Sequence, residues 1–372
     1  RKLIGLLALG LSGIACRSAT EPASGPGSIV WSFPAGSGTA PAVADSTVYF
    51  GTYDNTALAL DSRTGTLRWR TSTGETGGSP GRNVLLVGPL LIVPDFGVYA
   101  FDRATGQKRW SFRPASGDSP GRYAIATDGT RIFLGSAAGF AYALDAATGS
   151  VLWTNAYAVD GNSTMSYPMT DRGQVYLTLR HFTNPSTGGV VALDALTGAL
   201  RWERDFPSTA PGRGTGSYGR VGIWHDLVIA ASDDGTVYAL NRADGTIAWI
   251  SPRPADEAGL NDQRPIVVIG DIAVVGSDRS VLTGLDAASG QQRWLFRNRF
   301  GSVNDDIGSD GQSAYVTDAS LVLTKVDAAT GTMQWSNPTG APSTGPGFVG
   351  FPTADAERVY APGFSKVFAL LR

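Results

Sequence analysis

The sequence has very few of the residues that build covalent crosslinks or metal centres. Cys16 is the only cysteine among 372 residues, which excludes a disulfide bond within the chain. Histidine occurs only at His181 and His225, and two histidines that stand apart in the chain do not by themselves predict a zinc site. We therefore expect no metal centre, and a fold that depends on packing and backbone hydrogen bonds.

Charge of one sign and helical patterns are scarce as well. The 30 basic and 32 acidic residues give a formal net charge of −2, and no run of basic residues is present, which argues against nucleic acid as the main partner. No stretch carries the period of a long amphipathic helix. After residue 16, no apolar run is long enough to span a bilayer. These absences favour a nearly all-β fold.

The chain is instead rich in one repeated phrase: an apolar strand that ends in Asp or Asn, a turn with Gly, and then a Trp. The first copy runs from Ala59 to Trp69 and reads Ala-Leu-Asp-Ser-Arg-Thr-Gly-Thr-Leu-Arg-Trp. A period of about 40 to 50 residues is typical of arrays in which each unit packs only on its neighbours. The seven tryptophans of the phrase are Trp69, Trp110, Trp153, Trp202, Trp249, Trp294 and Trp335.

Each repeat contains four short apolar runs, which predict the four antiparallel strands of a propeller blade. In the first repeat, the runs 47–50 and 57–60 are bounded by Gly, Asp and Thr and form a hairpin pattern. The Asp-x-x-Thr-Gly stretch is a second hairpin turn, because Gly takes the positive φ that closes it. The Trp strand follows this turn, and a further apolar run precedes each unit.

Counting these units predicts an all-β, eight-bladed β-propeller over residues 28–372. Seven units end at Trp335, and an eighth begins at 347–351 but has no Trp strand of its own. The run 28–33 contains Trp31 and belongs to no unit, so we expect it to complete the last blade and remove the open strand edges. We expect the repeated Trp side chains, which bury about 150–250 Å² each, to pack between blades rather than on a ligand.

The N-terminus has the pattern of an export signal. Residues 1–16 start with two basic residues, continue with a short apolar core and reach Cys16 through small residues. Cys16 resembles a bacterial lipidation site, although Gly13 stands where Leu is usual, and the alternative is a simple signal peptide with an incidental cysteine. Arg17 replaces the Asp that retains lipoproteins at the inner membrane, which favours the outer one. Residues 17–27 read as a flexible tether.

The wording of the third unit resembles the repeats of pyrroloquinoline-quinone (PQQ) propellers. From Leu144 to Trp153 it reads Leu-Asp-Ala-Ala-Thr-Gly-Ser-Val-Leu-Trp, and similar wording recurs in every unit between 28 and 372. Two functional classes share this repeat. One comprises the quinoprotein alcohol and sugar dehydrogenases, which use PQQ and Ca²⁺. The other comprises non-catalytic eight-bladed lipoproteins, including the propeller subunit of the outer-membrane barrel-assembly machinery.

The residues present favour the second class. The dehydrogenases are typically longer, many hold the quinone with a disulfide between adjacent cysteines, and their Ca²⁺ ligands have no clear match here. The resemblance therefore implies a monomeric lipoprotein without cofactor, anchored on the periplasmic side of the outer membrane and bound to a protein partner such as an outer-membrane assembly complex. A PQQ-dependent periplasmic dehydrogenase or its degenerate relative, and a carbohydrate- or envelope-binding module, stay open as alternatives.

The candidate contact residues lie in the loops after each Trp strand and in the hairpin 180–188. Because strands alternate in direction, these connections open on one face of the ring. His181 and Phe182 belong to that hairpin, which is either a contact loop or an insertion that the fold tolerates. Charged residues near the inner strands are expected to converge on the central channel, where they hold an anion or a short peptide, or pair with one another. They are Arg82, Arg122, Arg220, Asp262, Arg264, Asp305 and Asp306.

Overall fold

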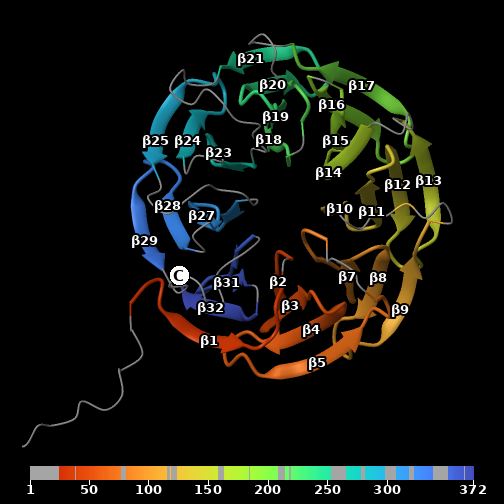
Figure 1. Ribbon diagram of the computed structural model, residues 1–372, viewed down its shortest axis with the longest axis vertical. Coiled ribbons are helices and arrows are strands. Elements are labelled where there is room, and N and C mark those ends of the chain that lie inside the picture. Colours follow the sequence, from red (N-terminus) through yellow and green to blue (C-terminus); the bar gives the residue numbers. More distant parts are fainter. Residues whose placement is uncertain are drawn as a thin grey trace, which may run out of the picture.

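Eight antiparallel sheets stand around a central axis and form a closed ring (Figure 1). Each sheet has four strands, which confirms the all-β, eight-bladed propeller. No helix among the described residues has the length and apolar character needed to cross a bilayer. The computed structural model describes residues 25–37, 39–76, 81–114, 118, 124–157, 163–183, 185–207, 214–217, 219–252, 265–277, 281–297, 307–317, 322–337, 351–363 and 365–372.

The strands follow one another from the inside of each blade to its rim (Figure 1). Blades one to four consist of β2 (Ala42–Ala44), β3 (Thr47–Gly51), β4 (Thr56–Asp61) and β5 (Leu67–Ser72); β6 (Leu85–Val87), β7 (Leu90–Pro94), β8 (Val98–Asp102) and β9 (Lys108–Phe112); β10 (Ile125–Thr127), β11 (Arg131–Gly135), β12 (Phe140–Asp145) and β13 (Val151–Ala156); and β14 (Ser163–Asp171), β15 (Gln174–His181), β16 (Thr187–Asp194) and β17 (Leu200–Asp205).

Blades five to eight repeat this order, except that the rim strand of blade eight comes from the N-terminal part of the chain. They consist of β18 (Gly222–Trp224), β19 (Leu227–Ala231), β20 (Val237–Asn241) and β21 (Ile247–Ser251); β22 (Ile266–Ile269), β23 (Ile272–Gly276), β24 (Val281–Asp286) and β25 (Gln292–Arg297); β26 (Gly308–Ser309), β27 (Ser313–Thr317), β28 (Leu323–Asp327) and β29 (Met333–Asn337); and β30 (Thr353–Ala354), β31 (Arg358–Pro362), β32 (Val367–Leu371) and β1 (Ile29–Phe33).

The hydrophobic core is divided into eight wedges, each lying between two neighbouring blades. In the wedge between blades three and four, for example, Phe133 and Ala143 pack with Leu177 and Val191. The same division holds around the ring, and the wedge between blades eight and one contains Trp31 and Tyr360. Each blade is therefore stabilised by contacts with its two neighbours, as the repeat period predicts.

The repeated Trp residues tie each blade to the next one. Trp153 of blade three donates its indole N–H to the carbonyl oxygen of Ala195 in blade four, at 3.1 Å. Its ring lies against Gly198 of the same turn, where an added Cβ would stand 2.7 Å from the ring. The predicted role of these residues in packing between blades is confirmed. Equivalent indole hydrogen bonds are made by Trp31, Trp69, Trp110, Trp202, Trp249 and Trp294.

The turn that carries each Asp is held together by the carboxylate. Oδ1 of Asp61 accepts hydrogen bonds from the backbone N–H groups of Arg63 and Thr64, at 3.0 and 2.9 Å. Arg68, on the following strand, donates to Oδ2 at 2.8 Å. The hydrogen bond from Arg68, followed by those of the turn, lowers the pKa of Asp61 to about 2. The corresponding arginine lowers the pKa to about 2 at Asp102, Asp194 and Asp286.

The ring closes as the sequence predicts. β1 pairs antiparallel with β32, and Trp31 stands opposite Ala369. The N–H of Gly27 donates to the carbonyl of Leu371 at 2.8 Å, and the N–H of Leu371 donates to the carbonyl of Ser28 at 2.9 Å. These two bonds have the same pattern as the backbone hydrogen bonds that close the Asp turns of the other blades. Residues near the two ends of the ring therefore form the equivalent of one such turn. Gly27 packs on Trp335, as Gly198 packs on Trp153.

One boundary predicted from the sequence is wrong. The inner strand of blade eight was expected at 347–351, whereas β30 covers only Thr353–Ala354. Residues 347–350 lie outside the described residues, and Phe351 is buried but belongs to no strand. Pro352, which has no N–H to give to a ladder, separates Phe351 from β30.

Candidate functional site

Blade four is built differently from the other blades at its loop end. β14 has nine residues, and β15 and β16 have eight each. The strand of blade one that corresponds to β15 is β3, which has five residues. The extra residues lengthen the β15–β16 hairpin on the face of the ring at which the Trp strands end. The far face of the same blade carries the short turn from Asp194 to Gly198. The structure therefore singles out one hairpin on one face.

Strand pairing continues further into this hairpin than the sequence indicated. The segment 180–188 was expected to be a loop, but His181 pairs with Thr187 and Arg180 with Gly188 in the ladder between β15 and β16. The loop itself shrinks to 182–186. Register extends because the alternation of side chains along β15 is not interrupted before Phe182. The candidate residues His181 and Phe182 thus stand at the end of a strand and at the start of a short tip.

Phe182 is exposed at this tip, with 51% of its surface accessible. The guanidinium of Arg180 lies over its ring, 5.4 Å from the centroid, which is within the range of a cation–π contact. Arg180 also forms an ion pair with Asp233 of blade five, with Nε 3.0 Å from Oδ2. Ser186, on the other side of the tip, donates to the same carboxylate oxygen at 2.8 Å. Asp233 therefore braces both arms of the hairpin.

The contacts that Asp233 makes with Arg180 and Ser186 are important because its carboxylate is buried. Asp233 is only 3% exposed, although its sequence context of Asp-Asp-Gly reads as an ordinary surface turn. A buried carboxylate is tolerated when it is paired and hydrogen-bonded, as it is here. Sequence reasoning missed this residue, because nothing in the wording of blade five shows that blade four reaches over to it.

The inner strands surround a central cavity of about 500 Å³. Segments of all eight blades line it, and Arg220 is the one charged side chain among the described lining residues. Arg82 does not line it, and its carbonyl accepts a hydrogen bond from the N–H of Ala40. The convergence of charges on the channel stays a prediction for the remaining candidates, which lie outside the described residues together with Cys16. They are Arg122, Asp262, Arg264, Asp305 and Asp306.

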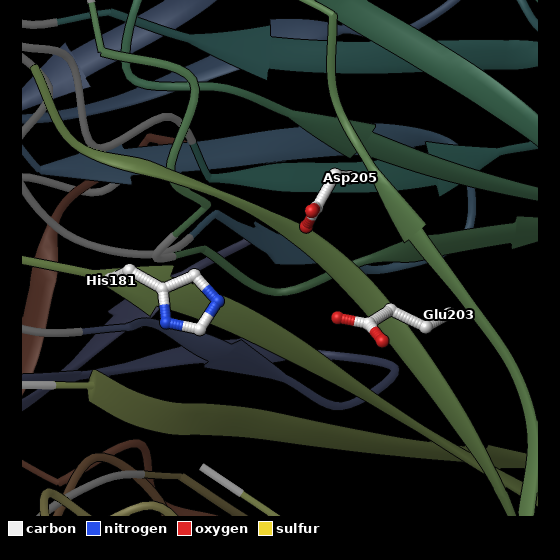
Figure 2. A group of neighbouring side chains, drawn as sticks. All are labelled: His181, Glu203 and Asp205. Atoms are coloured by element: carbon white, nitrogen blue, oxygen red, sulfur yellow. The ribbon is translucent and has the colours of Figure 1, made fainter. Parts of the chain in front are cut away.

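The structure brings His181 together with two carboxylates that the sequence reasoning did not select. Glu203 and Asp205 lie on the rim strand β17, and one donor atom from each of the three residues lies within 4.8 Å of the others (Figure 2). His181 is partly buried, whereas both carboxylates are exposed. Their position relative to the repeat could have identified them in the sequence, because Glu203 and Asp205 are the first and third residues after Trp202. His225, on another blade, is not part of this group.

Fold and repeat wording together define a PQQ-like β-propeller repeat protein. A sequence model described as outer membrane protein assembly factor BamB matches residues 20–95, 94–205 and 178–297. These segments cover well over half of the chain, so the protein belongs to that family.

Individual relatives are more distant. BamB of Yersinia pestis is 26% identical over 255 residues, which span 64% of this chain and 61% of that protein. The crystal structure of BamB from Moraxella catarrhalis superimposes with a TM-score of 0.71 at 17% identity, covering 92% of this chain and 99% of that one. Quinohemoprotein alcohol dehydrogenase from Comamonas testosteroni also gives 0.71, at 16% identity, with 92% and 76% covered. The solved structures support the propeller fold in both functional classes.

Proposed function

We propose that this protein is a non-catalytic lipoprotein scaffold that faces the periplasm from the outer membrane and binds a protein partner in outer-membrane protein assembly. The observation that carries the proposal is the match of the BamB family over residues 20–297. The superposition on the Moraxella catarrhalis BamB propeller agrees with the fold that the proposal requires. The export signal predicted for residues 1–16, with lipidation proposed at Cys16, would provide the anchor.

The braced hairpin of blade four is the surface that we assign to the partner. Phe182 is an exposed aromatic residue on a tip whose two arms are fixed to Asp233 through Arg180 and Ser186. Aromatic residues are frequent binding hot spots, and a side chain that is already held loses less conformational freedom on binding. A rigid tip of this kind suits insertion into an apolar pocket of another protein.

A membrane pull-down with the full-length protein tests both the partner and the surface. We expect the wild-type protein to recover an outer-membrane assembly complex, identified by mass spectrometry. Phe182→Ala should weaken binding by about 2 kcal/mol, or about 30-fold in Kd, if Phe182 is a hot spot. Leu196→Ala is the matched control, because Leu196 is 70% exposed on the opposite face of the same blade.

Other outcomes would contradict the proposal in different ways. Loss of binding in the Leu196 variant but not in the Phe182 variant would place the partner on the far face. Dye-linked alcohol oxidation after addition of PQQ and Ca²⁺ would support the dehydrogenase class instead. Retention of a Cys16→Ser variant in the membrane fraction after a high-salt wash would contradict lipid anchoring through Cys16.

A further inference from the structure

Blade four carries acidic residues where none of the other blades does. The eight Trp strands of the ring serve as internal references for one another, since all occupy the same place in their blades. The first residues after their tryptophans are Ser32, Arg70, Ser111, Thr154, Glu203, Ile250, Leu295 and Ser336, and the third residues are Pro34, Ser72, Arg113, Ala156, Asp205, Pro252, Arg297 and Pro338. The propeller fold therefore does not require carboxylates at these positions.

Strand register places both carboxylates on the same face of the sheet as His181. In the ladder from β15 through β16 to β17, Leu179 stands opposite Gly189, and Gly189 opposite Asp205. His181 is two residues after Leu179, and Glu203 is two residues before Asp205, so all three side chains project from one face. That face is turned toward blade three, because Leu179 packs in the wedge between blades three and four.

Gly189 leaves the space between the strands open. On β16 it stands opposite Asp205, between Thr187, which is opposite His181, and Val191, which is opposite Glu203. A Cβ at Gly189 would lie 1.9 Å from the carbonyl oxygen of Arg204, so the close backbone approach admits no larger residue here. The imidazole and the carboxylates face one another across β16, where Gly189 contributes no side chain.

The imidazole of His181 is oriented by its other nitrogen. Nδ1 lies 2.5 Å from the hydroxyl oxygen of Ser163, which can accept a hydrogen bond from Nδ1–H. Nε2, the other ring nitrogen, points toward Glu203 and Asp205 (Figure 2). On the opposite side of the group, the hydroxyl of Tyr157 donates to Oε2 of Glu203. Such outer hydrogen bonds are typical of side chains that bind metal ions, because they hold the ligands in place.

The neighbouring arginines are directed elsewhere. Arg180, beside His181, pairs with Asp233 of blade five. Arg204, between the two carboxylates in sequence, donates from Nε to the carbonyl of Gly245 at 2.8 Å. Two exposed carboxylates and an imidazole thus lie together, and no lysine or arginine of the described residues forms an ion pair with either carboxylate.

We propose that Nε2 of His181 and one oxygen each of Glu203 and Asp205 bind a divalent transition-metal ion, for which Zn²⁺ fits best. Ligand distances of about 2.1 Å place tetrahedral donors about 3.4 Å apart. The present donors lie within 4.8 Å of one another, so rotation of two exposed carboxylates closes the difference. Imidazole favours Zn²⁺ over Mg²⁺ or Ca²⁺, which prefer oxygen ligands alone. Three protein ligands leave a fourth position for water or a partner's side chain.

Titration of the untagged full-length protein with Zn²⁺, followed by calorimetry, tests the proposal. We expect one saturable site, an affinity at least tenfold lower in His181→Ala and in Asp205→Asn, and no competition by a tenfold excess of Mg²⁺. His225→Ala is the matched control, because it removes the only other histidine and should leave the affinity unchanged. Cobalt supplies a second readout, since visible bands of bound Co²⁺ should vanish in His181→Ala.

Several results would overturn the proposal. They are the absence of saturable Zn²⁺ uptake by the wild-type protein, an affinity that His181→Ala leaves unchanged, and an equal loss in His225→Ala. Thermal unfolding without metal checks that each variant is folded. Should His181→Ala be unstable, Glu203→Gln serves instead, because its amide keeps an oxygen acceptor for the Tyr157 hydroxyl while removing the charge. Unchanged affinity in that variant would equally refute the three-ligand site.

Discussion

Replacement of Gly198 by Ala tests how the blades are joined. Gly198 has a φ of +72°, and a Cβ there would lie 2.7 Å from the ring of Trp153 in the preceding blade. Gly173, on another turn of the same blade, has a φ of +76°, but a Cβ there would meet nothing within 4 Å. The two glycines therefore share backbone conformation and differ in contact. Gly173→Ala is the matched control for Gly198→Ala.

The expected magnitudes follow from this difference. Placing Ala in the left-handed region costs about 1–2 kcal/mol at either position. Only Gly198→Ala also forces a methyl group into the indole of Trp153, and overpacking of this kind costs about 1–3 kcal/mol more. We therefore expect the free energy of unfolding to fall by about 1–2 kcal/mol in Gly173→Ala and by about 2–5 kcal/mol in Gly198→Ala.

Urea unfolding monitored by tryptophan fluorescence measures both changes. A double variant of Gly198→Ala with Trp153→Leu provides a further test, because the smaller side chain makes room for the methyl group. In that background the additional effect of Gly198→Ala should shrink to that of Gly173→Ala. Equal destabilisation by the two single variants would refute the idea that close packing of Trp on Gly joins the blades.

Three further predictions concern closure, acid stability and binding. Deletion of residues 28–33 should lower the melting temperature of the whole ring, because it removes β1 and exposes the edge of β32; melting like that of the intact protein would show that closure does not depend on β1. Stability should fall as the pH drops from about 4 toward 2, because the turn aspartates have a folded pKa of about 2 and an unfolded pKa of about 3.9. Converting these four residues to Asn, as found naturally at Asn241, should flatten the decline in urea midpoint between pH 4 and pH 2. Phe182→Ala should weaken partner binding without lowering the melting temperature, since Phe182 is exposed; an equal loss of both would mean that the residue supports the hairpin rather than the partner.

The repeat wording was sufficient to predict blade number, strand order and closure. Strand order depends on signals within one repeat, such as the apolar run before Asp61 and the Trp at position 69, and blade number and closure follow from counting the copies of these signals along the chain. Where local signals conflicted, a boundary was misplaced: the inner strand of blade eight was expected to end at Phe351, whereas β30 covers Thr353–Ala354, after Pro352. The pairing of Arg180 and His181 in the ladder was missed because Pro185 and Phe182 nearby suggested a contact loop.

The sequence by itself determined the architecture, because a period of about 40 to 50 residues with one Trp per unit allows few other arrangements. Only the tertiary structure determined which residues contact one another at the loop ends of the blades. It placed buried Asp233 under the hairpin of blade four, and it brought His181 to Glu203 and Asp205 across the bare backbone of Gly189. These contacts depend on strand register and on the packing of neighbouring blades, which bring together residues that no local pattern connects.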